Sequence, residues 1–229
     1  MKKILIKIVI CSTIFGFMIL FTIPFQSCDK KKDTVKPDSI KKDSVVVPVK
    51  VYEPYIYLYP QNEISLAVNI TFPKGGKIVA SIPSYSSGWD INVDSTGKIN
   101  KKYDYLFYES EQPDEWQYTS GWIIKTDSLM IFFQQNMSEY GFNSKEIKDF
   151  VDYWVSRFNK YNYYLIYPQE ESIIDKLIQV NYSIKPDNLL RLFYAIKGTN
   201  VLLKIDKHLI KTNFKRNGFY VAEWGVILK

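Results

Sequence analysis

Thiols and imidazoles are nearly absent from this chain. Its 229 residues contain two cysteines, Cys11 and Cys28, and one histidine, His208. The residues after Cys28 therefore cannot form a disulfide framework, a cysteine-ligated zinc site or a cysteine nucleophile. One histidine also excludes a metal site with two histidine ligands, although by count alone it leaves a serine–histidine–aspartate triad open. We expect neither a metal nor a cofactor.

The first 28 residues have the composition of an export signal. An apolar run covers residues 8–25, with Pro24 and Gln26 at its far end. The run is at the short limit of the roughly 17–25 residues that span a bilayer, and the proline would interrupt a continuing helix. A processed signal segment is therefore favoured over an uncleaved membrane helix. The positive start of the segment comes from three lysines: Lys2, Lys3 and Lys7.

The segment closes with Ser27-Cys28, an ending that resembles a bacterial lipobox, in which a small residue precedes the cysteine that is lipidated. We predict a signal peptide over residues 1–27 and a lipid on Cys28. Each buried CH₂ of an acyl chain contributes about 0.8 kcal/mol, so several chains on one cysteine would hold the protein on a membrane almost irreversibly. The expected location is the bacterial cell envelope, on the periplasmic side or at the cell surface.

A tether follows the signal. Residues 29–50 contain no aromatic side chain and repeat a lysine–aspartate pentad at Lys31–Val35, Lys36–Ile40 and Lys41–Val45. A segment with mixed charge and few large apolar residues cannot bury enough surface to offset its ordering entropy. We predict a disordered tether over residues 28–50, which could extend to roughly 70 Å at about 3.3 Å per residue.

The positive charge of the chain is confined to these leading segments. The formal charge is +6, but residues 51–229 carry 20 Lys and Arg against 20 Asp and Glu. A neutral globular part gives no electrostatic reason to bind nucleic acid, so we expect no nucleic-acid partner. About 180 residues suit a single domain, predicted over 51–229.

The first part of that domain has the pattern of strands. Short runs rich in β-branched and aromatic residues alternate with Gly, Pro, Asp and Ser clusters, which favour turns. The predicted strands are Tyr55–Pro60, Ile64–Phe72, Lys77–Ile82, Trp89–Val93, Tyr103–Glu109 and Gly121–Lys125.

The middle has the pattern of two helices. Apolar residues from Leu129 to Tyr140 fall on one helical face, and Gly141 gives a stop signal. Asn143 and Glu146 then have the spacing of a capping box, followed by a second apolar stripe that ends at Phe158. The sequence therefore predicts a central helical hairpin.

The last third returns to strands, at Leu177–Ile184, Leu189–Ile196 and Phe219–Leu228. The first alternates apolar and polar residues, as in a half-buried strand, whereas the other two are apolar on both faces. Strands, then helices, then strands predict an α+β fold with mostly antiparallel sheet.

Three charged residues interrupt apolar strands: Glu109, Arg191 and Glu223. A buried charge without a partner is costly, so each is expected to find a partner or to line a cleft. In one arrangement Glu109 and Glu223 form an acid/base pair beside Arg191, as in a carboxylate-dependent hydrolase. In another, Arg191 bridges carboxylates on neighbouring strands, and in a third the charges lie at sheet edges in solvent. The bridging arrangement is favoured.

Two further groups could contact a ligand. The aromatic residues Trp89, Tyr108 and Trp224 are candidates for an aromatic binding face, and Tyr153 with Trp154 could form a platform, although a core position is favoured for that pair. A basic cluster precedes the last strand and could meet anionic glycans or lipid headgroups, although a solvated loop is favoured. It contains Lys204, Lys207, Lys211, Lys215 and Arg216, with His208 and Asp206 among them.

Five ordered segments of the domain also resemble an uncharacterised family of bacterial and fungal proteins. The segments are Glu53–Pro60, Gly88–Gly97, Tyr105–Glu109, Asp149–Trp154 and Glu223–Gly225. They are similar to the motifs KPxxYLYP, WxVxAxxDG, YLFWE, DFxxYW and EWGG. The chain departs from the pattern at Val155, where Leu-Pro would follow, and at Val226, where a second glycine would stand. The resemblance implies one domain and, because the family has no established activity, assigns no site residue.

These observations favour a lipid-anchored cell-envelope protein that works as a binding or interaction module. Its expected partners are the membrane, through the N-terminal lipid, and a glycan, a peptide or another envelope protein. The alternative is a hydrolase that uses Glu109 and Glu223 on envelope or extracellular glycans.

Overall fold

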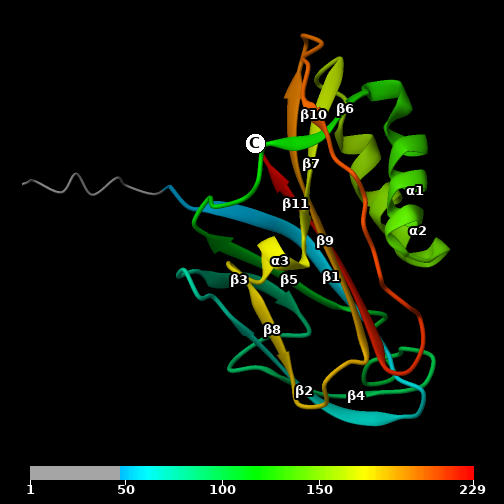
Figure 1. Cartoon of the computed structure of the whole chain (residues 1–229). Coiled ribbons are helices and arrows are strands. Elements are labelled where there is room, and N and C mark those ends of the chain that lie inside the picture. Colours follow the sequence, from blue (N-terminus) through cyan, green and yellow to red (C-terminus); the bar gives the residue numbers. More distant parts are fainter. Residues whose placement is uncertain (1–46) are drawn as a thin grey trace, which may run out of the picture. The chain divides into compact units, whose positions relative to one another are not determined.

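The computed structural model describes residues 47–229 (Figure 1). The predicted signal segment, the lipidation site Cys28 and most of the predicted tether lie outside the described residues. The first strand begins at Val49, two residues before the predicted start of the domain at 51. No helix within the described part is long and apolar enough to cross a membrane.

Eight strands form the large sheet, in the order β10-β6-β7-β9-β11-β1-β5-β3. Its pairings are antiparallel, except that β9 runs parallel to β11 and β6 runs parallel to β10. The strands are β1 (Val49–Tyr59), β3 (Lys77–Ile82), β5 (Leu106–Gln112), β6 (Ser120–Lys125), β7 (Tyr163–Glu170), β9 (Asn188–Thr199), β10 (Asp206–Lys207) and β11 (Tyr220–Leu228).

A second, three-stranded sheet covers one face of the large one, in the order β4-β2-β8. Its strands are β2 (Ile64–Thr71), β4 (Trp89–Val93) and β8 (Gln179–Tyr182). Each of the three alternates between more buried and exposed residues, the pattern of a sheet with one face in the core and one in solvent.

The helical hairpin covers the other face (Figure 1). It consists of α1 (Leu129–Tyr140) and α2 (Ser144–Trp154), with one-turn 3₁₀ segments at 126–128 and 155–157. Gly141 ends α1 in a left-handed conformation (φ 110°), and Asn143 and Glu146 form both bonds of a capping box. A short α3 (Glu171–Ile174) follows β7.

The large sheet is thus covered on both faces. This explains why β9 and β11 are apolar on both faces, since the side chains on either side of each strand are buried. Along β11, Val221 and Ile227 pack toward the small sheet, whereas Ala222, Trp224 and Val226 pack toward the helices. The α+β fold with a helical hairpin and mostly antiparallel sheet is confirmed.

Apart from the one-turn 3₁₀ segments, three elements were not predicted: β7, α3 and the two-residue strand β10. Pro168 lies inside β7, and proline within a run argues against a strand because it cannot donate a ladder hydrogen bond. Here β6 pairs with β7 only up to Ile166, and the carbonyl of Pro168 accepts a hydrogen bond from the Gln117 side chain instead (2.7 Å). The strand tolerates the proline because Pro168 lies past the last residue that pairs with β6, while the pairing of β7 with β9 continues through Glu170.

Residues 200–219 connect β9 to its parallel neighbour β11, and we call them the crossover segment. They pass over the helical side of the sheet (Figure 1). Thr212 Oγ1 donates to the carbonyl of Tyr140 (3.3 Å), and Arg216 Nε donates to that of Gly141 (2.9 Å). The segment is therefore fastened to the end of α1.

Candidate functional site

Arg191 and Glu223 form a buried ion pair. They lie opposite each other on β9 and β11, and 2.5 Å separates Arg191 Nε from Glu223 Oε2. The two side chains are 1% and 0% exposed. Tyr108 on β5 donates its hydroxyl hydrogen to Glu223 Oε1 (2.7 Å). Burial, and then the charge of Glu223, raises the pKa of Tyr108, so its hydroxyl remains a donor at neutral pH.

Glu109 does not belong to this cluster. It follows Tyr108 on β5, and because successive side chains of a strand point to opposite faces, it lies on the other face of the large sheet. Its carboxylate pairs with Lys50 Nζ at 2.5 Å. The alternative that pairs Glu109 with Glu223 as acid and base does not fit: the sheet separates the two carboxylates, and they share no cleft.

The three aromatic binding candidates are core residues. Trp89 lies under the small sheet and donates its ring N–H to the carbonyl of Pro83 (2.8 Å), and Trp224 packs against Phe150 beneath the helices. With Tyr108 also buried, none of them presents a ring to solvent. Of the pair for which a core position is favoured, Trp154 is buried, whereas Tyr153 is half-buried and donates its hydroxyl hydrogen to Glu53 Oε1 (2.8 Å). Large aromatic side chains on two-sided strands gain more from core burial than from exposure.

The single histidine contacts a serine and a glutamate. Ser120 Oγ lies 3.1 Å from His208 Nδ1, and Glu170 Oε1 lies 2.9 Å from His208 Nε2. A serine hydrolase also needs free N–H groups to stabilise an oxyanion. The N–H groups of Thr119 and Ser120 both donate to Gln117 Oε1 instead (3.1 and 3.2 Å). The arrangement therefore lacks a donor set beside the serine.

The basic cluster divides in two. Arg216 pairs with the buried carboxylate of Glu146 and is part of the fold. Its four lysines are exposed: Lys204, Lys207, Lys211 and Lys215.

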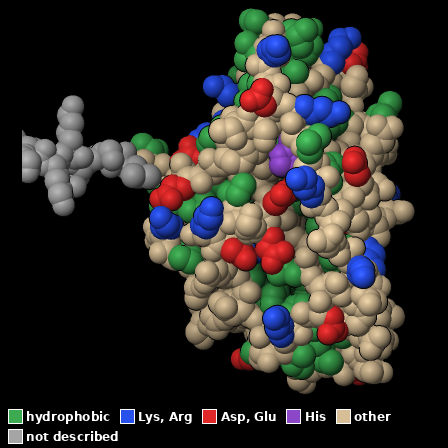
Figure 2. Space-filling view, in the orientation of Figure 1, with side chains coloured by type: hydrophobic (Ala, Val, Ile, Leu, Met, Phe, Trp, Pro, Cys, Tyr) green, Lys and Arg blue, Asp and Glu red, His purple; other side chains and the backbone are tan. Residues whose placement is uncertain are grey.

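A groove of about 910 Å³ opens where β7 ends, and we call it the β9 groove. Its lining comes from α3, β8, the first four residues of β9 and residues 211–214 of the crossover segment. Figure 2 shows this face of the molecule hollowed near its centre, with carboxylates above apolar side chains. Such a volume lies within the usual range for ligand sites, about 300–1,000 Å³.

The first feature of this groove is an open strand edge. β7 pairs with β9 only as far as Glu170 opposite Leu192, and the chain then turns away into α3. Within the described residues, Asn188–Arg191 of β9 therefore have β11 on one side and no strand on the other. The N–H of Lys229, the residue after β11, donates to the carbonyl of Ile196 on β9. Because backbone groups alternate along a strand, the backbone N–H and C=O groups of the even-numbered residues of β9 point toward β11. The backbone of Leu189 faces the groove.

A second open edge lies across the groove, on β8. This strand pairs with β2 alone, and Ser183 N donates to the carbonyl of Ala67 on β2 (2.9 Å). By the alternation of an antiparallel ladder, the backbone groups of Val180 and Tyr182 point away from β2. Both residues line the groove. The groove therefore lies between two unpaired strand edges, that of β9 in the large sheet and that of β8 in the small sheet.

Arg191 connects the groove to the buried ion pair. Its Nη1 donates to Asp175 Oδ1 (2.5 Å) and to the carbonyl of Ile178 (2.8 Å) at the groove wall. Within residues 47–229, its Nη2 and the hydroxyl of Tyr182 are buried without a hydrogen-bond partner. These two polar groups are enclosed beside the groove and are not presented on its surface.

Charges of both signs lie around the groove. Burial, and then the neighbouring charge of Asp175, raises the pKa of Glu171 on α3. In the described part, Glu171, Lys185 and Lys211 take part in no ion pair. Together with Asp187, which accepts a hydrogen bond from the backbone N–H of Phe219 but forms no ion pair among the described residues, these groups could contact a charged ligand. Among the same residues, no group of three or more His, Cys, Asp or Glu side chains is placed to hold a metal ion.

Comparisons of this chain with protein-family models, curated proteins and solved structures found no match. The resemblance carried by the five ordered segments stays a prediction. Of the sequence candidates, Arg191 and Lys211 line the groove. Glu171, Tyr182 and Leu189 were missed, and the adjacent acidic pair Glu170-Glu171 after an apolar run was the one available signal.

Proposed function

We propose that this chain is a lipid-anchored cell-envelope protein that works by binding, and that its ligand is an extended peptide held in the β9 groove. The observation that carries the proposal is the open edge of β9 at Asn188–Arg191, where β7 has left the sheet. An extended peptide can add to such an edge through main-chain hydrogen bonds, and pockets for alternate side chains then give specificity.

The two walls of the groove suit a strand. Tyr140 and Phe214 line the helical side, and Val180 and Tyr182 line the side of the small sheet. Successive side chains of a bound strand would point alternately to these walls, because the period of a strand is two. Glu171 would sit beside a basic side chain of the peptide, and Lys185, in the turn before β9, would meet an acidic one.

The positions of Glu223 and Glu109 favour a binding function over hydrolysis. Glu223 is held by Arg191 and Tyr108 in a fully buried cluster, so its carboxylate has no access to a substrate. Glu109, the second carboxylate of the alternative hydrolase, is on the opposite face of the sheet and is paired with Lys50.

A panel of extended peptides, displayed in random sequence and read by fluorescence polarisation, would test the peptide site. Ser172→Trp places a bulky ring in the groove lining, and Ser138→Trp, an exposed position on α1 outside the lining, is the matched control. We expect Ser172→Trp to weaken binding at least tenfold and Ser138→Trp to leave it unchanged.

Amide hydrogen exchange then distinguishes strand addition from other binding modes. A bound strand should slow exchange at Leu189, Val180 and Tyr182, whose N–H groups face the groove. Peptides that bind without protecting these amides, or a panel in which glycans bind and peptides do not, would contradict the proposal.

The anchor has its own test. Cys28→Ala should abolish acylation and leave an unprocessed precursor, since the cysteine is the acceptor of the lipid. Metabolic labelling with palmitate measures this, and label that persists in the variant would end the lipoprotein interpretation.

A further inference from the structure

Exposed apolar side chains gather at one end of the large sheet, where β6 and β9 end and β7 begins. Three loops meet there: Thr126 N donates to the carbonyl of Asn162 (3.1 Å), and Asn162 N donates to Asn200 Oδ1 (3.1 Å). The loops and the first turn of α1 carry six large apolar residues that are 44–66% exposed. We call them the strand-end patch: Met130, Ile131, Tyr161, Val201, Leu202 and Leu203.

This patch is unusual for the molecule. Val201, Leu202 and Leu203 form a continuous exposed aliphatic run in a loop, whereas exposed apolar residues elsewhere in the described part are mostly single, such as Val79 on β3. Scattered single residues need no explanation, but a cluster on one end marks an interaction surface. The loop hydrogen bonds hold the patch in place.

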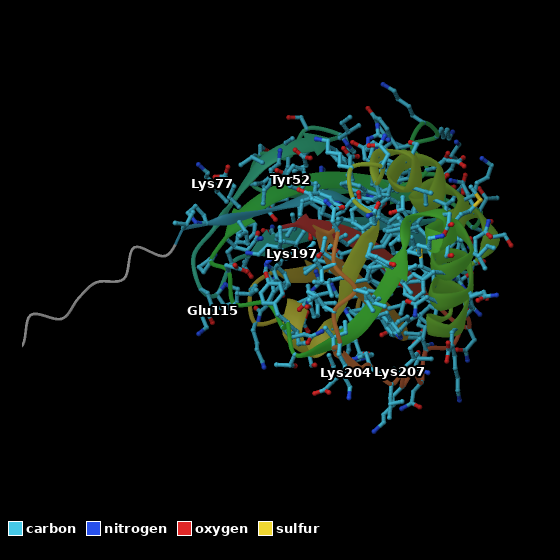
Figure 3. All side chains as sticks on the ribbon, turned by 90° about the horizontal axis from the view of Figure 1, so that it is seen from above. Tyr52, Lys77, Glu115, Lys197, Lys204 and Lys207 are labelled. Atoms are coloured by element: carbon cyan, nitrogen blue, oxygen red, sulfur yellow. The ribbon has the colours of Figure 1, made fainter. Side chains whose placement is uncertain are left out.

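Lysines surround the patch. Lys160, Lys197 and Lys204 are exposed and, among the described residues, take part in no ion pair. Figure 3 looks onto this end of the sheet, with Lys197 near the middle and Lys204 and Lys207 projecting at the margin. Figure 2 shows the apolar side chains at the same end, at the top of the view, beside basic ones. Aliphatic tips with a lysine rim are complementary to an anionic lipid surface.

The chain also enters the domain at this end. Val51 of β1 pairs with Ile227, and Ile227 pairs with Ala195 of β9, so the start of β1 and the end of β9 lie at the same end of the large sheet. The predicted tether over residues 28–50, with a reach of up to roughly 70 Å, is long enough for a domain held by a lipid at Cys28 to bring this end to the membrane. A membrane fits this combination better than a protein partner does.

We propose that the strand-end patch docks on an anionic membrane surface and fixes the orientation of the domain, with the β9 groove left accessible along the side of the molecule. Val201, Leu202 and Leu203 enter the boundary between headgroups and acyl chains, while Lys160, Lys197 and Lys204 bind the headgroups. The lipid anchor of the proposed function brings the patch to the membrane, but the surface chemistry of the patch is independent of it.

The test uses the full-length acylated protein in vesicles of phosphatidylcholine, with or without phosphatidylglycerol. An environment-sensitive fluorophore is attached through Leu202→Cys or, as matched control, through Val79→Cys, an exposed aliphatic position on the edge strand β3. With phosphatidylglycerol we expect emission at position 202 to shift to shorter wavelength and to be quenched by lipid-attached quenchers. Position 79 should keep the spectrum seen in water.

Two further measurements distinguish docking of the strand-end patch from the action of the lipid anchor. Changing Lys160, Lys197 and Lys204 together to Gln, or raising the salt concentration, should remove the shift at 202 without changing secondary structure. In a non-acylated chain that lacks residues 1–28, and with them the signal segment and Cys11, the shift should survive with anionic vesicles, whereas failure of the anchor alone would change acylation and leave the shift intact.

Three results would overturn the proposal. They are equal, water-like spectra at 202 and 79 on anionic vesicles, a shift of the same size on pure phosphatidylcholine, and a shift that is present before any vesicle is added. The last would assign the patch to a contact between two copies of the chain.

Discussion

The two faces of the large sheet each bury one glutamate against one arginine, but they do so differently. On the face of the small sheet, Glu223 and Arg191 are direct neighbours on adjacent strands, and both are buried. On the helical face, Glu146 is buried, but Arg216 reaches it from the crossover segment and is 25% exposed. The first pair is set by strand register in the centre of the fold, and the second by a segment that lies on its surface.

The difference predicts how strongly each pair is coupled to folding. The buried negative charge of Glu223 is stabilised by the side chains of Arg191 and Tyr108. The charge of Glu146 is stabilised by Arg216 and, in addition, by a hydrogen bond from the backbone N–H of Asn143 (2.8 Å) in the capping box. Loss of the arginine should therefore cost more on the small-sheet face than on the helical face.

The largest effect is expected at the central pair. Arg191→Met leaves Glu223 charged and buried, and Glu223→Gln leaves Arg191 without its main partner. Breaking a buried pair typically costs about 3–5 kcal/mol of unfolding free energy. Because each variant removes the same interaction, the double variant should lose less than the sum of the two. Urea unfolding of the single and double variants measures this.

Glu109→Gln is the matched control for that cycle. Glu109 also interrupts an apolar strand, but its partner Lys50 is 31% exposed. Its loss should stay near the value for a partly exposed pair, about 1 kcal/mol or less. Additive losses below about 0.5 kcal/mol for Arg191→Met and Glu223→Gln would mean that the central charges are solvated and uncoupled.

A smaller effect is expected on the helical face. Arg216→Met removes the ion pair to Glu146 but leaves the carboxylate its hydrogen bonds from Asn143. A hydrogen bond to a charged group contributes about 1.5–3 kcal/mol, so we expect a loss at the lower end of that range. The measurement is again urea unfolding, side by side with Arg191→Met. A loss equal to or larger than that of Arg191→Met would remove the distinction between the two faces.

The central pair could be anticipated because a charge inside an apolar strand must find a partner. Arg191 and Glu223 each stand between apolar neighbours, so the sequence favours a bridge across strands without any knowledge of the strand order. The exclusion of Glu109 could not be anticipated in the same way. It depends on the position of β5 beside β1 and on which face of β5 turns inward, and periodicity alone leaves that choice open.

The β9 groove could not be predicted, because it exists where an unpredicted strand stops. The run that forms β7 contains Pro168, which argues against a strand, and the groove begins two residues later. The unpaired residues of β9 can be identified only when the position at which β7 ends is known. The two helices could be predicted from the sequence, because the periodic apolar residues, the stop at Gly141 and the cap at Asn143 are all local signals.

The third prediction isolates the cap from the ion pair on the helical face. Asn143→Ala removes the side-chain acceptor for Glu146 N (2.9 Å), and loss of an N-cap typically costs about 1 kcal/mol. Asn143→Ser should recover most of that stability, because serine caps nearly as well. Thermal unfolding of the two variants provides the measurement. Equal losses for alanine and serine would show that the side-chain amide of Asn143, which donates to Tyr59 and to Glu146 Oε1, matters more than the cap at this position.

The smallest effect is expected at Glu171, which lies beside Asp175 near Arg191 without sharing its ion pair. Burial and the charge of Asp175 raise the pKa of Glu171 in the folded protein, so the folded state holds its proton to higher pH than the unfolded state does. Stability therefore falls as pH rises through the interval between the unfolded and folded pKa values. Above that interval the ionised carboxylate carries a constant penalty, which Glu171→Gln removes.

Because Glu171 is largely exposed, solvent screens this penalty, and Glu171→Gln should raise the free energy of unfolding at neutral pH by less than about 0.5 kcal/mol. Below the usual glutamate pKa of about 4.3 the variant and the parent should be equally stable, since both then carry a neutral side chain. Urea midpoints at the two pH values give the comparison. A loss of about 1 kcal/mol or more at neutral pH would place Glu171 inside the charge network of Arg191, and Glu171 would then not be free to pair with a basic peptide side chain.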